Sequence, residues 1–114
     1  MTITPINLHA GYLLDVTTVA LFTNDSTATR TIITAASAHN THTAALTFDI
    51  YIVPSGGSVS AAYEIYGSEP VATLKTHKMS ALVGQELDPG DVLYGKASTA
   101  SKIACRISGM KIVS

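Results

Sequence analysis

The sequence predicts an all-β fold, either an antiparallel β-sandwich or a jelly roll of about seven to nine short strands. Apolar and polar residues alternate with a period of two in residues 46–53, and Thr, Val and Ile are concentrated in short runs. Turn-forming residues recur roughly every 8 to 12 residues. With 114 residues, of which 46% are hydrophobic, the chain can bury one core.

The clearest strand signal is the stretch LTFDIYIVPSGG, residues 46–57. On an extended chain its side chains separate onto two faces, with Leu46, Phe48, Ile50 and Ile52 on one and Thr47, Asp49 and Tyr51 on the other. Pro54 ends the strand because it has no N–H for the ladder, and Ser55–Ser58 form a turn.

Residues 1–15 are expected to be an N-terminal arm or an edge strand, and residues 16–114 a single β-sandwich domain. The β-branched run that begins at Val16, with the apolar residues after it, predicts a strand within residues 12–22 that ends at Phe22. The polar residues from Thr23 to Ser26 then favour a turn, because Asn and Asp bond their own backbone there.

Two local hairpins are expected from pairs of neighbouring strand-like segments. Residues 27–38 would pair with residues 43–53, and residues 92–97 with residues 102–113, each across a four-residue polar loop. Short strands are also predicted at 61–66 and 71–78, with a break at residues 67–70.

The strongest turn signal is Asp88-Pro89-Gly90-Asp91, where Pro presets the first central position and Gly supplies the positive φ of a type II turn. The segment before it, Met79–Leu87, has helical spacing of apolar residues. Its shortness and Gly84 favour irregular chain or a strand instead.

The last strand changes phase near its end. Ile103, Cys105 and Ile107 alternate inward, whereas the apolar residues resume at Met110 and Ile112, one residue out of phase. A β-bulge with positive φ is therefore expected at Gly109. Cys105 is expected to be a small core residue.

Charge and cysteine content exclude several classes of function. Charged residues are 13% of the chain, against about 25% in an average domain. Seven scattered Lys and Arg residues and a net charge of -1 offer no basic stripe for nucleic acid. The single cysteine cannot form an internal disulfide, and no signal peptide or membrane anchor is recognisable. We expect a chain made in the cytoplasm that binds neither nucleic acid nor a membrane.

No residue pattern indicates catalysis, a cofactor or a metal site. His39 and His42, even with His9 or His77, lack neighbouring Cys or carboxylate ligands in the sequence, and ordinary loop histidines are the better interpretation. Asp49 could be combined with a histidine and a serine into a triad, but a triad is recognised by its geometry, and an outward, solvated Asp is the better interpretation. The protein is therefore not expected to be an enzyme.

Tyrosines are the candidate contact residues, because exposed Tyr is frequent at interfaces and in sugar-binding sites. Tyr51 and Tyr66 fall on the face opposite the inferred core, and Val53, Val59 and Val71 could extend the patch that they form. Tyr12 lies in the N-terminal arm, which is a second candidate contact. The alternatives are that each tyrosine covers the rim of its own sandwich, or that the second sheet buries both faces.

Three segments in order carry a resemblance. They are the strand end Tyr51–Gly57, the turn and strand Leu87–Leu93, and the close of the domain at Lys96–Ala100 followed by Ile107–Gly109. Together they resemble small β-sandwich virion proteins of tailed bacteriophages, either capsid decoration (cement) proteins or tail-associated proteins. Those relatives more often have a Pro-Ala-Gly turn after the first strand, where this chain has Thr23–Ser26.

This resemblance implies a structural protein of the virion without catalytic residues. The expected role is a decoration or cement protein that binds and stabilises the major capsid shell, with a tail, neck or fibre component as the alternative. The expected partners are the major capsid protein or other virion proteins, and further copies of the chain in a homo-oligomer such as a trimer. A carbohydrate-binding module that uses exposed Tyr is the hypothesis from another class.

Overall fold

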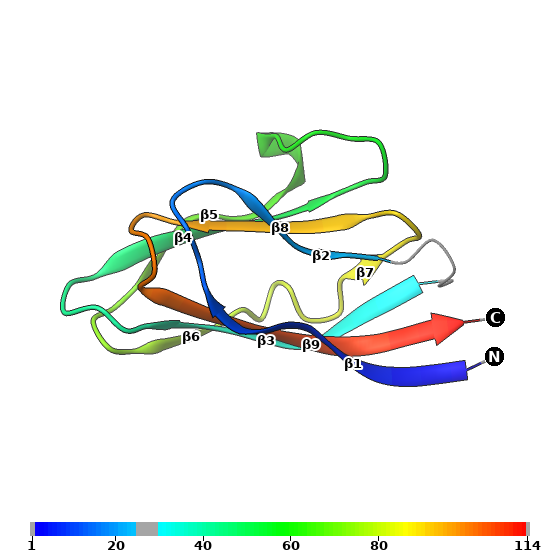
Figure 1. The fold of residues 1–114 in the computed structure, drawn as a ribbon, viewed down its shortest axis with the longest axis horizontal. Coiled ribbons are helices and arrows are strands. Elements are labelled where there is room, and N and C mark those ends of the chain that lie inside the picture. Colours follow the sequence, from blue (N-terminus) through cyan, green and yellow to red (C-terminus); the bar gives the residue numbers. More distant parts are fainter. Residues whose placement is uncertain (1, 25–29, 114) are drawn as a thin grey trace.

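The chain folds into two antiparallel β-sheets that pack face to face, as the computed structural model shows for residues 2–24 and 30–113, without the side chains of residues 10–13 (Figure 1). Nine strands and one short 3₁₀ helix occur in these ranges. They are β1 (Thr2–Leu13), β2 (Val19–Thr23), β3 (Arg30–Asn40), β4 (Leu46–Val53), η1 (Ala61–Tyr63), β5 (Glu64–Val71), β6 (Thr76–Lys78), β7 (Glu86–Leu87), β8 (Val92–Ala97) and β9 (Ile103–Val113). The expected all-β class is confirmed.

The strand order identifies the jelly roll. One sheet has the order β1-β9-β3-β6, with β7 also paired to β3, and the other has the order β2-β8-β4-β5. Most connections therefore cross from one sheet to the other, as in two interlocked Greek keys. We call the first sheet the β9 sheet and the second the β8 sheet.

The two expected hairpins are wrong. Strand β3 pairs with β9 and β4 pairs with β8, so β3 and β4 lie in different sheets, and so do β8 and β9. The polar loops between them are long enough to cross the sandwich, which lets the apolar faces of successive strands meet across the core. Of the described strands, only β4 and β5 are consecutive in the chain and paired with each other in one sheet.

The N-terminal segment forms an edge strand. Strand β1 pairs antiparallel with β9 from Thr2, opposite Val113, to Leu13, opposite Ala104. The two ends of the chain consequently lie side by side (Figure 1). No described strand pairs with the outer side of β1, so this long edge is open.

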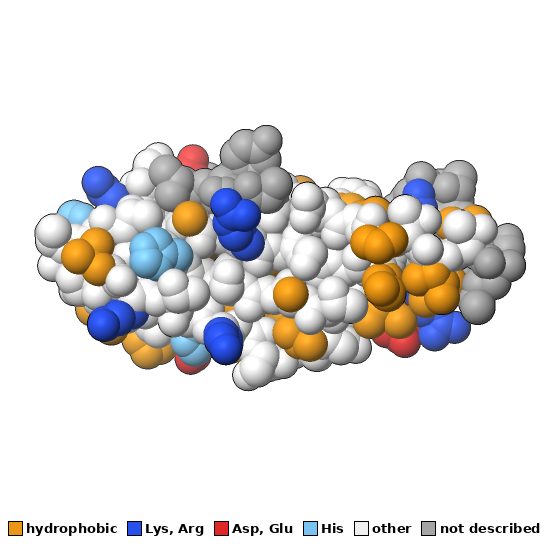
Figure 2. Space-filling model, turned by 90° about the horizontal axis from the view of Figure 1, so that it is seen from below, with side chains coloured by type: hydrophobic (Ala, Val, Ile, Leu, Met, Phe, Trp, Pro, Cys, Tyr) orange, Lys and Arg blue, Asp and Glu red, His pale blue; other side chains and the backbone are white. Residues whose placement is uncertain are grey.

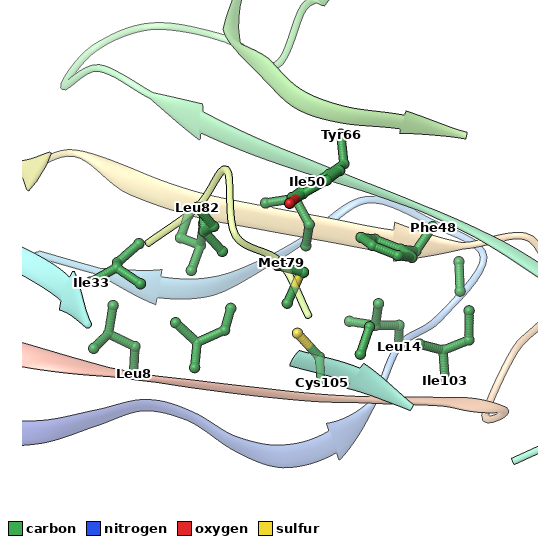
Figure 3. Packing of buried hydrophobic residues seen from close by; sticks show 14 of the residues in the cluster. Leu8, Leu14, Ile33, Phe48, Ile50, Tyr66, Met79, Leu82, Ile103 and Cys105 are labelled. Atoms are coloured by element: carbon green, nitrogen blue, oxygen red, sulfur yellow. The ribbon is translucent and has the colours of Figure 1, made fainter. Parts of the chain in front are cut away.

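The core lies between the sheets and receives side chains from both (Figure 3). Strand β9 contributes Ile103, Cys105 and Ile107, all at most 2% exposed, and β4 contributes Phe48 and Ile50. Burial raises the pKa of the Cys105 thiol to about 12, which keeps it neutral. The expectation that Cys105 is a small core residue is confirmed.

The irregular segment between β6 and β7 closes one side of this core. Met79, Leu82 and Leu87 are completely buried although residues 80–84 form only turns. The backbone is held to β3, because Gly84 N–H donates to the Ile33 carbonyl at 2.7 Å. Irregular chain or a strand, rather than a helix, was expected for residues 79–87, and this expectation is confirmed by turns that lead into β7.

The predicted turn at residues 88–91 is also confirmed. Gly90 has a φ of 87°, and Asp91 N–H donates to the Asp88 carbonyl at 3.0 Å. Next to this turn lies buried Asn24, whose Nδ2 donates to the Leu87 carbonyl and whose Oδ1 accepts from the Thr31 hydroxyl at 2.6 Å. The rest of the turn predicted after Thr23 falls at residues 25–29, outside the described residues.

The bulge expected at Gly109 lies instead in both neighbouring strands. Leu8 of β1 and Thr34 of β3 are the extra residues, and β9 runs straight between them without positive φ at Gly109. Glycine is required there for another reason. A Cβ at Gly109 would lie 2.3 Å from the Ile32 carbonyl oxygen. Strand β3 therefore packs against β9 at a position where β9 has no side chain.

The segment after β4 departs from the predicted short strands. Residues 61–63 form η1, and β5 then runs through the expected break at residues 67–70 to Val71. Two irregularities in its pairing with β4 absorb the extra residues, and Ser68 has a φ of 47°. Residues 72–75 form a turn region rather than strand.

Candidate functional site

Two of the three tyrosines expected at an interface are buried within the subunit. Tyr51 is 7% exposed and Tyr66 is 9% exposed, so the expectation that both are exposed contact residues is wrong. Tyr12 belongs to β1, but its side chain lies outside the described residues. The patch that Val53 and Val71 were expected to extend is absent as well, because these side chains are 1% and 2% exposed.

Tyr51 is buried because a loop covers the outer face of the β8 sheet. After β4, Gly57 N–H donates to the Pro54 carbonyl at 2.9 Å, and the chain then turns back over the sheet to η1 (Figure 1). Tyr51 and Val53 therefore lie between strand β4 and this loop. Burial, with the carboxylates of Asp49 and Glu64 nearby, raises the pKa of Tyr51.

Tyr66 points into the core because the irregular pairing of β5 changes which residues face inward. Its ring packs against Phe48 and against His77, with centroid distances of 5.4 and 5.7 Å. Its hydroxyl accepts a hydrogen bond from Ala81 N–H at 3.0 Å. Tyr66 thus joins the two sheets and the β6–β7 segment, and it is unavailable to a sugar or a partner protein.

The other candidate residues have structural contacts. His39 Nδ1 lies 2.8 Å from the Thr76 hydroxyl, and His77 Nε2 lies 3.6 Å from a Glu69 carboxylate oxygen. Asp49 accepts from Ser68 N–H and pairs with Lys96 at 3.5 Å. Within the described residues, no group of three or more His, Cys, Asp or Glu side chains could hold a metal ion. The described part of the chain also contains no helix that could span a lipid bilayer.

A groove of about 500 Å³ lies on the outer face of the β9 sheet. Its floor is made of small side chains of β3 and β9, including Ala35, Ser37 and Ser108. Strand β1 forms one wall, and the segment from Lys78 to Val83 forms the other. We call this hollow the basic groove, for the charges described next.

Two positively charged side chains, those of Arg106 and Lys78, line the basic groove. The register places Arg106 of β9, Ser37 of β3 and Lys78 of β6 in one row across three adjacent strands. His9 of β1 also lines the groove, and the register pairs it with Ile107, the residue that follows Arg106. Neighbouring strands are about 4.8 Å apart, so Ser37 stands one strand spacing from each cation. No acidic residue is among the described residues that line the groove.

An apolar patch adjoins the groove on the same face. Two further rows of the register contain Ile3 with Ile112, and Pro5 with Met110 and Ile32. Ile3 is 51% exposed and Met110 is 40% exposed. Figure 2 shows this face, with basic side chains around its middle and hydrophobic side chains gathered toward one end. We call these five residues the apolar patch.

No protein-family model and no curated protein matches the chain. Solved structures do match it in fold. One is a chain of the T13 particle of infectious bursal disease virus, with a TM-score of 0.62 and 12% identity. Another is a subunit of the Bacillus endospore appendages, described as disulfide-linked pili, with a TM-score of 0.57 and 13% identity. At such identities the likeness concerns the fold alone.

The two matches differ in how much of each protein is shared. Both matches cover 98% of this chain. This chain spans only 31% of the length of the viral chain, but 88% of the length of the appendage subunit. A third match, the VP2 protein of the bursal disease virus in a subviral particle, has a TM-score of 0.54 and 33% of its length covered. The jelly roll of this chain thus corresponds to one part of the viral chain and to nearly the whole appendage subunit.

Sequence reasoning missed the basic groove because its charges come from distant parts of the chain. Arg106 and Lys78 are 28 positions apart in the printed sequence, and only the pairing of both strands with β3 unites them. One local signal existed. Arg106 lies between the buried residues Cys105 and Ile107, so the alternation alone indicates an outward-facing cation in the middle of a long strand.

Proposed function

We propose that the chain is a structural protein of a virus particle, namely a decoration or cement protein that binds the major capsid shell of a tailed bacteriophage. The observation that carries the proposal is the jelly roll, which spans 98% of the chain and is shared with a chain of an icosahedral viral particle. The sequence resemblance to small virion proteins supports the same class.

The surface supports a role in assembly. A chain with 13% charged residues presents largely Thr, Ser and Ala to its surroundings, and one face combines an apolar patch with a groove. The open edge of β1 offers backbone groups to another copy, which supports a homo-oligomer such as a trimer. Attachment at many equivalent positions would let individually weak contacts stabilise a whole shell.

A tail, neck or fibre component remains the second candidate, because the appendage subunit has the same fold over 88% of its length. Such a fibre could not be linked by disulfides in this fold, since the single cysteine, Cys105, is completely buried. Its subunits would need other contacts. The carbohydrate-binding hypothesis loses its basis, because the tyrosines assigned to it are buried.

Immunogold electron microscopy of virions from the lysate that contains this protein tests the proposal. Gold distributed over the heads is the expected result, and deletion of the gene should then lower the temperature at which the capsids release DNA. Gold confined to tails or fibres would replace the decoration role with the second candidate. Absence of label from every particle would overturn a virion role altogether.

A further inference from the structure

We propose that the basic groove binds a carboxylate group, an Asp or Glu side chain presented by an extended segment of a partner protein. The inference rests on the proposed function in one respect only, that the partner is another virion protein. Arg106, Lys78 and Ser37 hold the carboxylate, and the apolar patch receives a neighbouring hydrophobic side chain.

The row geometry provides the carboxylate site. A carboxylate above Ser37 is flanked by Arg106 on one side and by Lys78 on the other, each one strand spacing away. Both side chains are exposed and long enough to bend toward it, and the Ser37 hydroxyl can donate a third hydrogen bond. Arg favours this ligand because its planar guanidinium matches a carboxylate with two parallel hydrogen bonds.

Arg106 and Lys78 have no acidic partner among the described residues. Two other cations have carboxylate partners, since Arg30 lies 3.2 Å from Glu86 and Lys96 lies 3.5 Å from Asp49. No ion pair joins Lys78 or Arg106 to any described carboxylate, and none of the described groove residues is acidic. An incoming carboxylate therefore meets positive potential without a competing anion.

The surroundings favour a protein segment over the other sources of negative charge. A nucleic acid would need a longer run of cations than this row, and the same face becomes apolar beyond it. No Phe, Tyr or Trp ring, the usual stacking surface for a sugar ring, is among the described groove residues. Small side chains on the floor leave room for an extended backbone, whose polar groups can bond Asn7 and Ser108.

The spacing between the two features predicts a motif in the partner. Met110 of the patch is four residues from Arg106 along β9, which corresponds to about 14 Å of extended chain. An extended segment that follows β9 would therefore place an acidic residue and an apolar residue four positions apart. The probe is the blocked peptide Ac-Ser-Glu-Thr-Ser-Thr-Ile-Ser-amide, with control peptides in which Gln replaces Glu or Ser replaces Ile.

Binding is measured on the isolated chain by NMR titration of backbone amides at low salt. The expected result is saturable shifts at Ser37, Arg106 and Ser108, with a Kd on the order of 1 mM that rises with added salt. The variant Arg106→Gln with Lys78→Gln should weaken binding at least about tenfold. The control Lys75→Gln with Lys102→Gln changes the net charge equally outside the groove and should bind as the wild type does.

Three outcomes would overturn the inference. They are the absence of saturable shifts up to about 10 mM peptide, equal binding of the Gln peptide, and tighter binding of galacturonic acid than of the peptide at the same residues. The last outcome would assign the groove to an acidic sugar. Because the titration uses the chain alone, it can fail while immunogold labelling still finds the protein on heads, and the reverse can also occur.

Discussion

Replacing Gly109 with Ala tests the packing of the long strands most directly. The new Cβ would lie 2.3 Å from the Ile32 carbonyl oxygen and 3.2 Å from Leu8 Cδ1. The side chain of Leu8 can rotate, but the carbonyl belongs to β3 and can move only if β3 and β9 separate. Overpacking costs about 1–3 kcal/mol, and each ladder hydrogen bond that lengthens costs about 1 kcal/mol more. We expect a loss of about 2–4 kcal/mol in the free energy of unfolding.

Urea unfolding followed by circular dichroism measures this loss, and a lowered midpoint with an unchanged m-value would assign it to the folded state. Gly84→Ala is the matched control, because Gly84 has a φ of 90° and no atom within 4 Å of the added Cβ. That control should lose about 1–2 kcal/mol through backbone strain alone. If Gly109→Ala unfolded within about 0.5 kcal/mol of the wild type, the close approach of β3 to β9 would be wrong.

Three further variants test other features of the fold. The folded Cys105 thiol has a pKa of about 12, against 9.0 as its ordinary value, so between these values the folded state holds the extra proton and stability falls as the pH rises. In the variant Cys105→Ala, the unfolding free energy should fall less steeply above about pH 9 than in the wild type, by up to about 1.4 kcal/mol per pH unit. If the variant and the wild type lost stability equally steeply, the burial of the thiol would be contradicted. Thr31→Val deprives buried Asn24 of its hydroxyl donor, so the free energy of unfolding in urea should fall by about 1–3 kcal/mol. A variant as stable as the wild type would mean that another donor replaces the hydroxyl. Tyr66→Phe removes the acceptor of Ala81 N–H and should cost about 1 kcal/mol while accelerating hydrogen exchange at that amide, and an unchanged exchange rate would argue against the bond.

Local chemistry made part of this fold predictable. The turn around Gly90 needs only a positive φ and a hydrogen bond between residues three apart, and both are encoded by the Asp-Pro-Gly-Asp sequence. Alternation placed Phe48, Ile50 and Cys105 in the core for the same reason, since the two-residue period is a property of the strand itself.

Pairing partners were not predictable in this way. A jelly roll pairs β1 with β9, the two ends of the chain, and nothing local distinguishes this arrangement from two hairpins. Bulges add a second difficulty, because one extra residue reverses which side chains face inward. Irregular pairing in β5 placed Tyr66 in the core, and a loop rather than a second sheet covers Tyr51, so both tyrosines were assigned to the wrong environment.

The two outer faces of the sandwich are unequal, and this inequality bears on the proposed attachment to a virus particle. The loop that carries η1 lies over the β8 sheet, whereas the face of the β9 sheet holds both the basic groove and the apolar patch (Figures 1 and 2). Strand β1 supplies residues to both features, including Asn7 and Ile3, and also forms the open edge. Copies joined through that edge would therefore bring their grooves onto one continuous surface. A millimolar site for a single carboxylate is then sufficient, because the second and third sites bind at a high effective concentration once the first is occupied.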